Sequence, residues 1–146
     1  MSNRRAAVEA WESLFRAQVS VMRHLNEGFP AQGMSFTEYD VLLNLSRQEG
    51  QRTRLKDLNQ HLLLTQPSVS RLIDRLVARG IVSKESDPGD ARGIVVALTE
   101  VGMKAFRSVA VLHSDSIAER VGSALSDDEL HQLTLLTEKL RLAGDA

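Results

Sequence analysis

The sequence predicts a mainly α-helical protein with a minor β component, in the element order α-α-α-α-β-β-α-α. Apolar residues recur at spacings of three and four over most of the chain, which is the period of amphipathic helices. Two runs of β-branched residues flank a connector rich in turn formers, and this arrangement predicts one β-hairpin. The helical pattern continues for long stretches on both sides of the central region.

Clear stop and start signals separate the first two helices. A stripe of apolar residues between Val8 and Phe29 predicts a long amphipathic helix that ends before Pro30. Ser35 and Glu38 then form a predicted capping box, in which each side chain satisfies a free amide at the start of the second helix.

Residues 54–80 predict a helix, a short turn and another helix. Thr65 is the expected N-cap of the later helix, and Pro67 lies in its first turn, where the missing N–H of proline costs nothing. Gly80 is the expected stop at the C′ position. The apolar face of this helix is centred on Val69, Ile73 and Leu76.

The hairpin is predicted from the β-branched runs at 81–84 and 94–98, with residues 87–93 as an extended polar tip. Thr99 caps the helix that follows, and a capping box of Ser126 and Glu129 begins the last helix. Three central helices followed by a hairpin are typical of a winged helix-turn-helix, although small helical domains with a hairpin also serve as protein-docking modules.

Composition excludes several classes of protein. The 146 residues are 42% hydrophobic and 25% charged, which is typical of a globular domain. The chain has no cysteine, so it makes no disulfide scaffold, thiolate zinc site or iron–sulfur ligation. We expect no cofactor, and no metal, because His24, His61, His113 and His131 are scattered at spacings unlike those of ligands. With neither an apolar span nor a secretory signal in view, we expect a cytoplasmic protein without membrane contact.

The net charge of −1 hides an uneven distribution along the chain. Residues 47–98 hold nine basic and six acidic side chains, a net +3, whereas residues 1–46 carry −1 and residues 99–146 carry −3. A basic central module between neutral and acidic ends is compatible with nucleic-acid binding, which needs a local basic footprint.

The helix predicted over 66–79 has the properties of a DNA-reading helix. With its apolar face against the core, Arg71 falls on the opposite side, where it reaches a guanine edge or a phosphate. Arg92, at the predicted hairpin tip, suits the narrow minor groove, and a carboxylate such as Asp74 or Asp90 would orient an arginine. The expected DNA-contacting residues are Gln66, Pro67, Ser68, Ser70, Arg71, Arg75, Lys84 and Arg92.

Residues 90–99, Asp-Ala-Arg-Gly-Ile-Val-Val-Ala-Leu-Thr, resemble the wing signature of the MarR (multiple antibiotic resistance regulator) family, and residues 66–76 are similar to its recognition helix. The resemblance implies a homodimer that binds an inverted repeat in double-stranded DNA, with Arg92 in the minor groove and Asp74 bracing it. Terminal helices that are more apolar than one small lobe can cover agree with a dimer. We therefore expect an N-terminal dimerisation helix (1–33), a winged helix-turn-helix DNA-binding domain (34–98) and C-terminal dimerisation helices (99–146), compact as one domain overall.

The family resemblance also implies a small effector, aromatic or anionic. Trp11 and Phe15 on the first helix, together with Tyr39 on the second, are candidates to line its cleft, and Arg16 or Arg23 to bind an anion. The alternative is that these aromatic side chains belong to the core or to the dimer interface.

Two functions remain as hypotheses at this stage. The first is a nucleoid-associated, dimeric transcription regulator, a repressor that a small ligand releases from DNA. The second is a winged-helix protein-interaction module that does not read sequence. Arg71 and Arg92 favour the first, because a docking module has no need of a basic helix beside a basic tip. An enzyme is not expected, because no nucleophile–base pairing or phosphate-binding glycine loop is visible.

Overall fold

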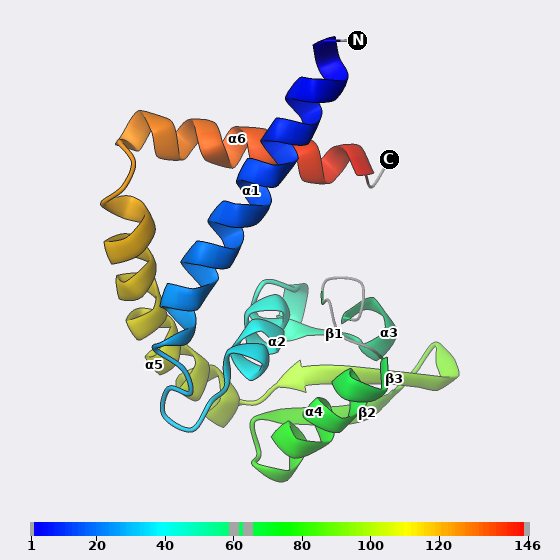
Figure 1. Ribbon diagram of the computed structural model, residues 1–146. Helices are drawn as coiled ribbons and strands as arrows, with labels where there is room; N and C mark the ends of the chain where they lie inside the picture. The colour runs from blue at the N-terminus through cyan, green and yellow to red at the C-terminus, as the bar shows by residue number, and fades with distance from the viewer. Residues whose placement is uncertain (1, 59–61, 63–65, 145–146) are drawn as a thin grey trace. The chain divides into compact units, whose positions relative to one another are not determined.

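The structure, a computed structural model, describes residues 2–58, 62 and 66–144. The chain forms two compact units, one made by residues 29–111 and the other by residues 1–28 together with 112–146. Figure 1 labels the helices and strands of both units. The mainly α-helical class with a small antiparallel sheet is confirmed.

Among the described residues of the unit 29–111, one core is surrounded by α2 (Phe36–Ser46), α3 (Leu55–Leu58), α4 (Gln66–Ala78) and the first part of α5 (Glu100–Ile117). All four helices contribute fully buried side chains, among them Leu42, Leu45, Leu58, Val69, Ile73, Leu76 and Val109. The apolar face predicted for α4 therefore does face the core. Thr65, the expected N-cap of α4, and His61 lie outside the described residues.

Both ends of this helical region are built as the sequence predicts. Ser35 Oγ accepts a hydrogen bond from the Glu38 N–H at 3.1 Å, and Glu38 Oε1 accepts one from the Ser35 N–H at 2.9 Å, which completes the capping box of α2. After α4, Gly80 takes a φ of 75°, and the Ile81 N–H bonds the Leu76 carbonyl at 3.0 Å. This left-handed glycine stop turns the chain directly into the sheet.

The three described strands are β1 (Arg52–Arg54), β2 (Val82–Asp87) and β3 (Asp90–Leu98). They form one antiparallel sheet in the order β1-β3-β2, with β3 in the middle. The sequence predicts an extended polar tip at residues 87–93, and this prediction is wrong because most of these residues belong to strands. Asp90 already pairs with Asp87, so only a two-residue turn remains between β2 and β3. Asp87 makes this turn possible, since its Oδ1 accepts the Gly89 N–H at 2.9 Å.

β1 was not predicted by the sequence. This three-residue strand has two arginines and no apolar alternation, and it exists because Arg52, Thr53 and Arg54 pair with Ala97, Val96 and Val95 of β3. Whether residues 52–54 form a strand is therefore decided by pairing with a strand more than forty residues later in the chain. β1 places the side chain of Arg54 next to Asp87, at the end of β2.

The second unit contains α1 (Ser2–Asn26), the end of α5 (Glu100–Ile117), a π-helical turn at Ala118–Gly122 and α6 (Asp127–Gly144). The second capping box is confirmed, because the Glu129 N–H bonds Ser126 Oγ at 3.2 Å and the Ser126 N–H bonds Glu129 Oε1 at 2.9 Å. Many large apolar side chains of these helices are exposed, among them Val8, Trp11, Phe15, Leu133, Leu136 and Leu140.

Candidate nucleic-acid interface

α4 presents a polar face to solvent. Arg71, Asp74 and Arg75 are exposed on the side of the helix opposite its buried residues, and Arg71 Nη2 lies 3.4 Å from Ser68 Oγ. Ser70 is partly buried. Gln66 and Pro67 lie in the first turn of the same helix. A helix with short hydroxyl side chains near its start and arginines farther along is suited to close approach to a nucleic-acid groove.

The hairpin of β2 and β3 carries the other predicted contacts. Arg92 is exposed near the start of β3, and its backbone N–H bonds Asp90 Oδ1 at 3.0 Å, so Asp90 shapes the chain beside the arginine. Asp74 pairs with Lys84, whose Nζ lies 2.9 Å from Asp74 Oδ1. Asp74, which the family resemblance places beside Arg92, thus pairs with Lys84 in this structure, and this pair links α4 to β2.

An ion pair between Arg54 and Asp87, and the close packing of Gly93 against Asp87, support the hairpin of this surface; the hydrophobic periodicity of the sequence predicts neither. Arg54 Nε of β1 lies 2.8 Å from Asp87 Oδ2 at the end of β2, and the Asp87 side chain is only 7% exposed. Gly93 leaves room for that carboxylate, because a Cβ at this position would lie 2.9 Å from Asp87 Cβ. The cluster of turn formers around Gly93 indicates a turn in the sequence. It does not indicate that Gly93 packs against Asp87, because that contact depends on the tertiary structure.

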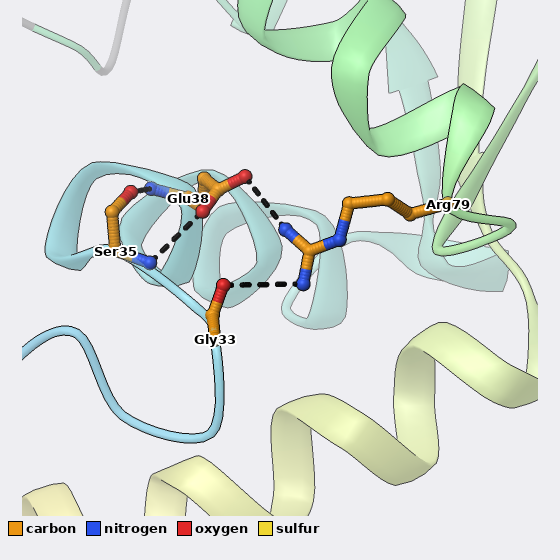
Figure 2. Close-up of polar contacts among 4 residues, drawn as sticks. All are labelled: Gly33, Ser35, Glu38 and Arg79. Atoms are coloured by element: carbon orange, nitrogen blue, oxygen red, sulfur yellow. Dashed lines mark hydrogen bonds and ion pairs between the residues drawn. The ribbon is translucent and has the colours of Figure 1, made fainter.

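A second ion pair joins the end of α4 to the start of α2. As Figure 2 shows, Arg79 reaches across so that Nη1 bonds Glu38 Oε2 at 3.1 Å and Nη2 bonds the Gly33 carbonyl at 3.2 Å. Glu38 is buried and accepts the Ser35 N–H through its other oxygen. One carboxylate therefore caps α2 and also fixes the C-terminal end of the helix that carries Arg71.

The candidate ligand residues fall into two different environments. Phe15 and Arg16 line a hollow of about 490 Å³ between α1 and the π-helical turn, together with Arg23, His24 and Arg120. Trp11 is exposed and its ring centroid lies 5.8 Å from that of Phe15.

Tyr39, by contrast, belongs to the core of the other unit. Only 5% of it is exposed, and its ring stacks on Phe106 with centroids 5.3 Å apart. Burial raises the pKa of its hydroxyl above the ordinary value. Trp11 and Phe15 are thus an exposed pair on α1, and Tyr39 is a core residue of the unit that contains α2.

Other kinds of site were sought over the same residues. No group of three or more His, Asp or Glu side chains that could hold a metal ion occurs in the part of the chain that the structure describes. No helix among the described residues is long and apolar enough to cross a membrane.

Comparison with known proteins gives one consistent result. Residues 32–93 match the model of the MarR family. The HTH-type transcriptional regulator YkoM of Bacillus subtilis is 32% identical over 133 residues, covering 91% of this chain and 84% of that protein. The transcriptional repressor MprA of Escherichia coli is 28% identical over 123 residues, covering 84% and 69%.

A solved structure agrees over nearly the whole fold. Sco3205 of Streptomyces coelicolor, a MarR family transcriptional regulator crystallised in complex with DNA, has a TM-score of 0.76 and 27% identity, covering 93% of this chain and 84% of its own. These proteins are transcriptional regulators and not enzymes. The chain therefore belongs to the MarR family of transcriptional regulators, as the wing and recognition-helix motifs predict.

Proposed function

We propose that the chain is a homodimeric repressor that binds an inverted-repeat operator in double-stranded DNA and leaves it when a small aromatic or anionic ligand binds. Such a regulator acts at the chromosome in the cytoplasm. The observation that carries the proposal is the exposed cationic set on α4 and β3, with Arg71 and Arg75 on the helix and Arg92 on the wing. Two relatives add support, since Sco3205 was solved with DNA and MprA is a transcriptional repressor.

In this proposal α4 enters the major groove with residues 66–71 and Arg75 near base edges and phosphates, and Arg92 enters the minor groove. Lys84 has a different role from the others, because its ion pair with Asp74 holds the wing to the helix. A two-fold dimer places its half-sites about one helical turn apart, roughly 10 base pairs from centre to centre.

Selection of bound sequences from a random DNA pool tests the proposal. We expect enrichment of an inverted repeat, and light scattering should give the mass of a dimer, since exposed apolar side chains such as Leu136 and Leu140 need a partner. A pool that shows no enrichment would refute sequence-specific binding and favour the protein-interaction module.

The ligand part of the proposal rests on the hollow beside α1, which is lined by one aromatic ring, Phe15, by three arginines and by one acidic residue: Arg16, Arg23, Arg120 and Glu27. Benzoate is a minimal probe, because it combines one ring with one carboxylate. We expect it to quench the fluorescence of the single tryptophan, Trp11, and to release the selected duplex. Arg23→Ala should weaken both effects, whereas Arg5→Ala, on the same helix and outside the hollow, should leave them unchanged. Equal responses of the two variants would refute this binding site.

A further inference from the structure

The ion pair of Arg54 and Asp87 is asymmetric in its exposure. The Asp87 side chain is 7% exposed, whereas 48% of the Arg54 side chain remains in solvent. No donor among the described residues makes a well-aligned hydrogen bond to Asp87 Oδ2, so the carboxylate holds Arg54 chiefly by charge, at 2.8 Å from Nε. A guanidinium has five N–H donors, and Asp87 is the partner of Arg54 among the described residues. The donors beyond Nε can therefore bond a second anion.

The position of this pair is fixed from several sides. Asp87 Oδ1 accepts the Gly89 N–H, the absence of a side chain at Gly93 leaves room for the carboxylate, and the strand register pairs Arg54 with Val95 of β3. Such over-determined placement restricts the rotamers of a side chain that would otherwise lose much entropy on binding a ligand.

Arg54 opens into a hollow of about 340 Å³ beside the wing. Lys56 and Arg92 also line this hollow, as do Ser70 of α4 and the carboxylates of Asp87 and Asp90. Three cationic groups thus face two carboxylates, of which one is paired with Arg54 and the other bonds the Arg92 backbone. The local charge is positive, at a place that touches both elements of the candidate nucleic-acid interface.

We propose that Arg54 binds a DNA phosphate, and that Asp87 is a positioning residue that aims its guanidinium at this phosphate. The inference rests on the proposed function, because it assumes that α4 and the wing dock on a duplex. The hollow then receives the sugar–phosphate backbone that runs from the major groove, at Ser70, to the minor groove, at Arg92. A bidentate contact of this kind strengthens binding to every sequence equally.

The direction in which Asp87→Asn changes the affinity for DNA distinguishes a positioning role of Asp87 from a purely electrostatic effect of its charge. Removing a carboxylate near DNA normally raises affinity, since it removes repulsion from the phosphates. If Asp87 positions Arg54, however, Asp87→Asn should lower affinity although it makes the protein more positive. In an Arg54→Ala background the same substitution should no longer lower affinity, because there is nothing left to position.

The chain offers a matched control on the same strands. Arg52 and Glu85 also join β1 to β2, but their closest approach is 4.0 Å, both are at least half exposed, and neither lines the hollow. The double variants R54A/D87N and R52A/E85Q both keep the wild-type net charge. Neither leaves a buried carboxylate unpaired, which is the change that would endanger folding.

Binding should be measured by fluorescence anisotropy, over a range of salt concentrations, to a duplex with the selected sequence and to one with a scrambled sequence. For R54A/D87N we expect about a tenfold loss of affinity for both duplexes. The slope of log K against log salt should fall by about 1.8, which corresponds to one lost phosphate contact per subunit. R52A/E85Q should keep the wild-type affinity and slope, and thermal unfolding should confirm that both variants are folded.

Equal behaviour of the two double variants, or a higher affinity of Asp87→Asn, would overturn the inference. Arg92→Ala makes this failure distinguishable from that of the proposed function. If Arg92→Ala weakens binding while R54A/D87N does not, only the role of Arg54 is wrong. If the wild-type protein binds neither duplex, the proposed function fails and the inference fails with it.

Discussion

Arg79→Ala should lower the stability of the protein by about 1–2 kcal/mol, through the loss of the contacts that join the end of α4 to the start of α2. Arg79 donates to Glu38 at 3.1 Å and to the Gly33 carbonyl at 3.2 Å. A hydrogen bond to a charged group contributes about 1.5–3 kcal/mol when buried. Because 42% of the Arg79 side chain is exposed, solvent screens the pair and lowers its contribution to about 1–2 kcal/mol.

A double-mutant cycle isolates the contribution of the ion pair. Glu38→Gln keeps an oxygen that accepts the Ser35 N–H, so the helix cap survives while the charge is lost. Urea unfolding of the wild type, the two single variants and the double variant, at one protein concentration, should give a coupling energy of about 1 kcal/mol. In thermal unfolding, each kcal/mol corresponds to a shift of roughly 2–4 °C for a chain of this size.

Arg75→Ala is the matched control, since Arg75 is an exposed arginine one turn earlier on α4 and forms no ion pair with another described residue. Its effect on stability should stay within about 0.5 kcal/mol. A coupling energy below about 0.3 kcal/mol, or an equal loss in Arg75→Ala, would refute the reasoning, because the exposed half of Arg79 would then be fully screened by solvent.

Three further predictions concern other parts of the same unit. Arg71→Ala should reduce discrimination at one base pair of the selected site by about 1–3 kcal/mol, measured with single-base variants of the duplex; unchanged discrimination would exclude base reading. Gly93→Ala should cost about 1–3 kcal/mol in thermal unfolding, because the added Cβ would lie 2.9 Å from Asp87 Cβ and must displace it; a wild-type melting temperature would contradict this. Burial raises the pKa of Asp40 above 3.8, so the folded state binds the proton of this carboxyl more tightly than the unfolded state does. The protonated carboxyl therefore contributes its full stabilisation below the unfolded pKa, and this stabilisation is lost as the pH rises. Asp40→Asn should therefore raise the melting temperature at neutral pH and lose this advantage toward pH 3.8; an advantage independent of pH would count against it.

Local signals predicted the helices well. The capping boxes at Ser35 and Ser126 and the left-handed stop at Gly80 each depend on residues within five positions of one another, so the sequence displays them directly. The exposed side of α4 follows from its periodicity for the same reason. The prediction of the hairpin was less accurate, because the Asp87 side chain shortens the turn and lets residues 90–93 join β3.

The parts of the site that the sequence could not predict all depend on distant partners. Arg79 lies 41 residues from Glu38, and Arg54 is brought to Asp87 only by the pairing of β1 with β3. Periodicity and turn chemistry carry no information on such pairs. The ion pair of Asp74 with Lys84 has the same origin, since it joins α4 to β2.

Ion pairing resolves why a net charge of −1 is compatible with a basic surface. In the unit of residues 29–111, acidic residues form ion pairs with four basic side chains, in the pairs Glu38–Arg79, Asp74–Lys84, Glu85–Arg52 and Asp87–Arg54. Arg71, Arg75 and Arg92 form no ion pair with any other described residue. Acidic residues therefore lower the total charge without pairing with Arg71, Arg75 or Arg92. It follows that affinity for a nucleic acid should respond to the position of a lost carboxylate and not to the change in net charge, so Asp87→Asn and Glu85→Gln, which change the net charge by the same amount, should shift it in opposite directions.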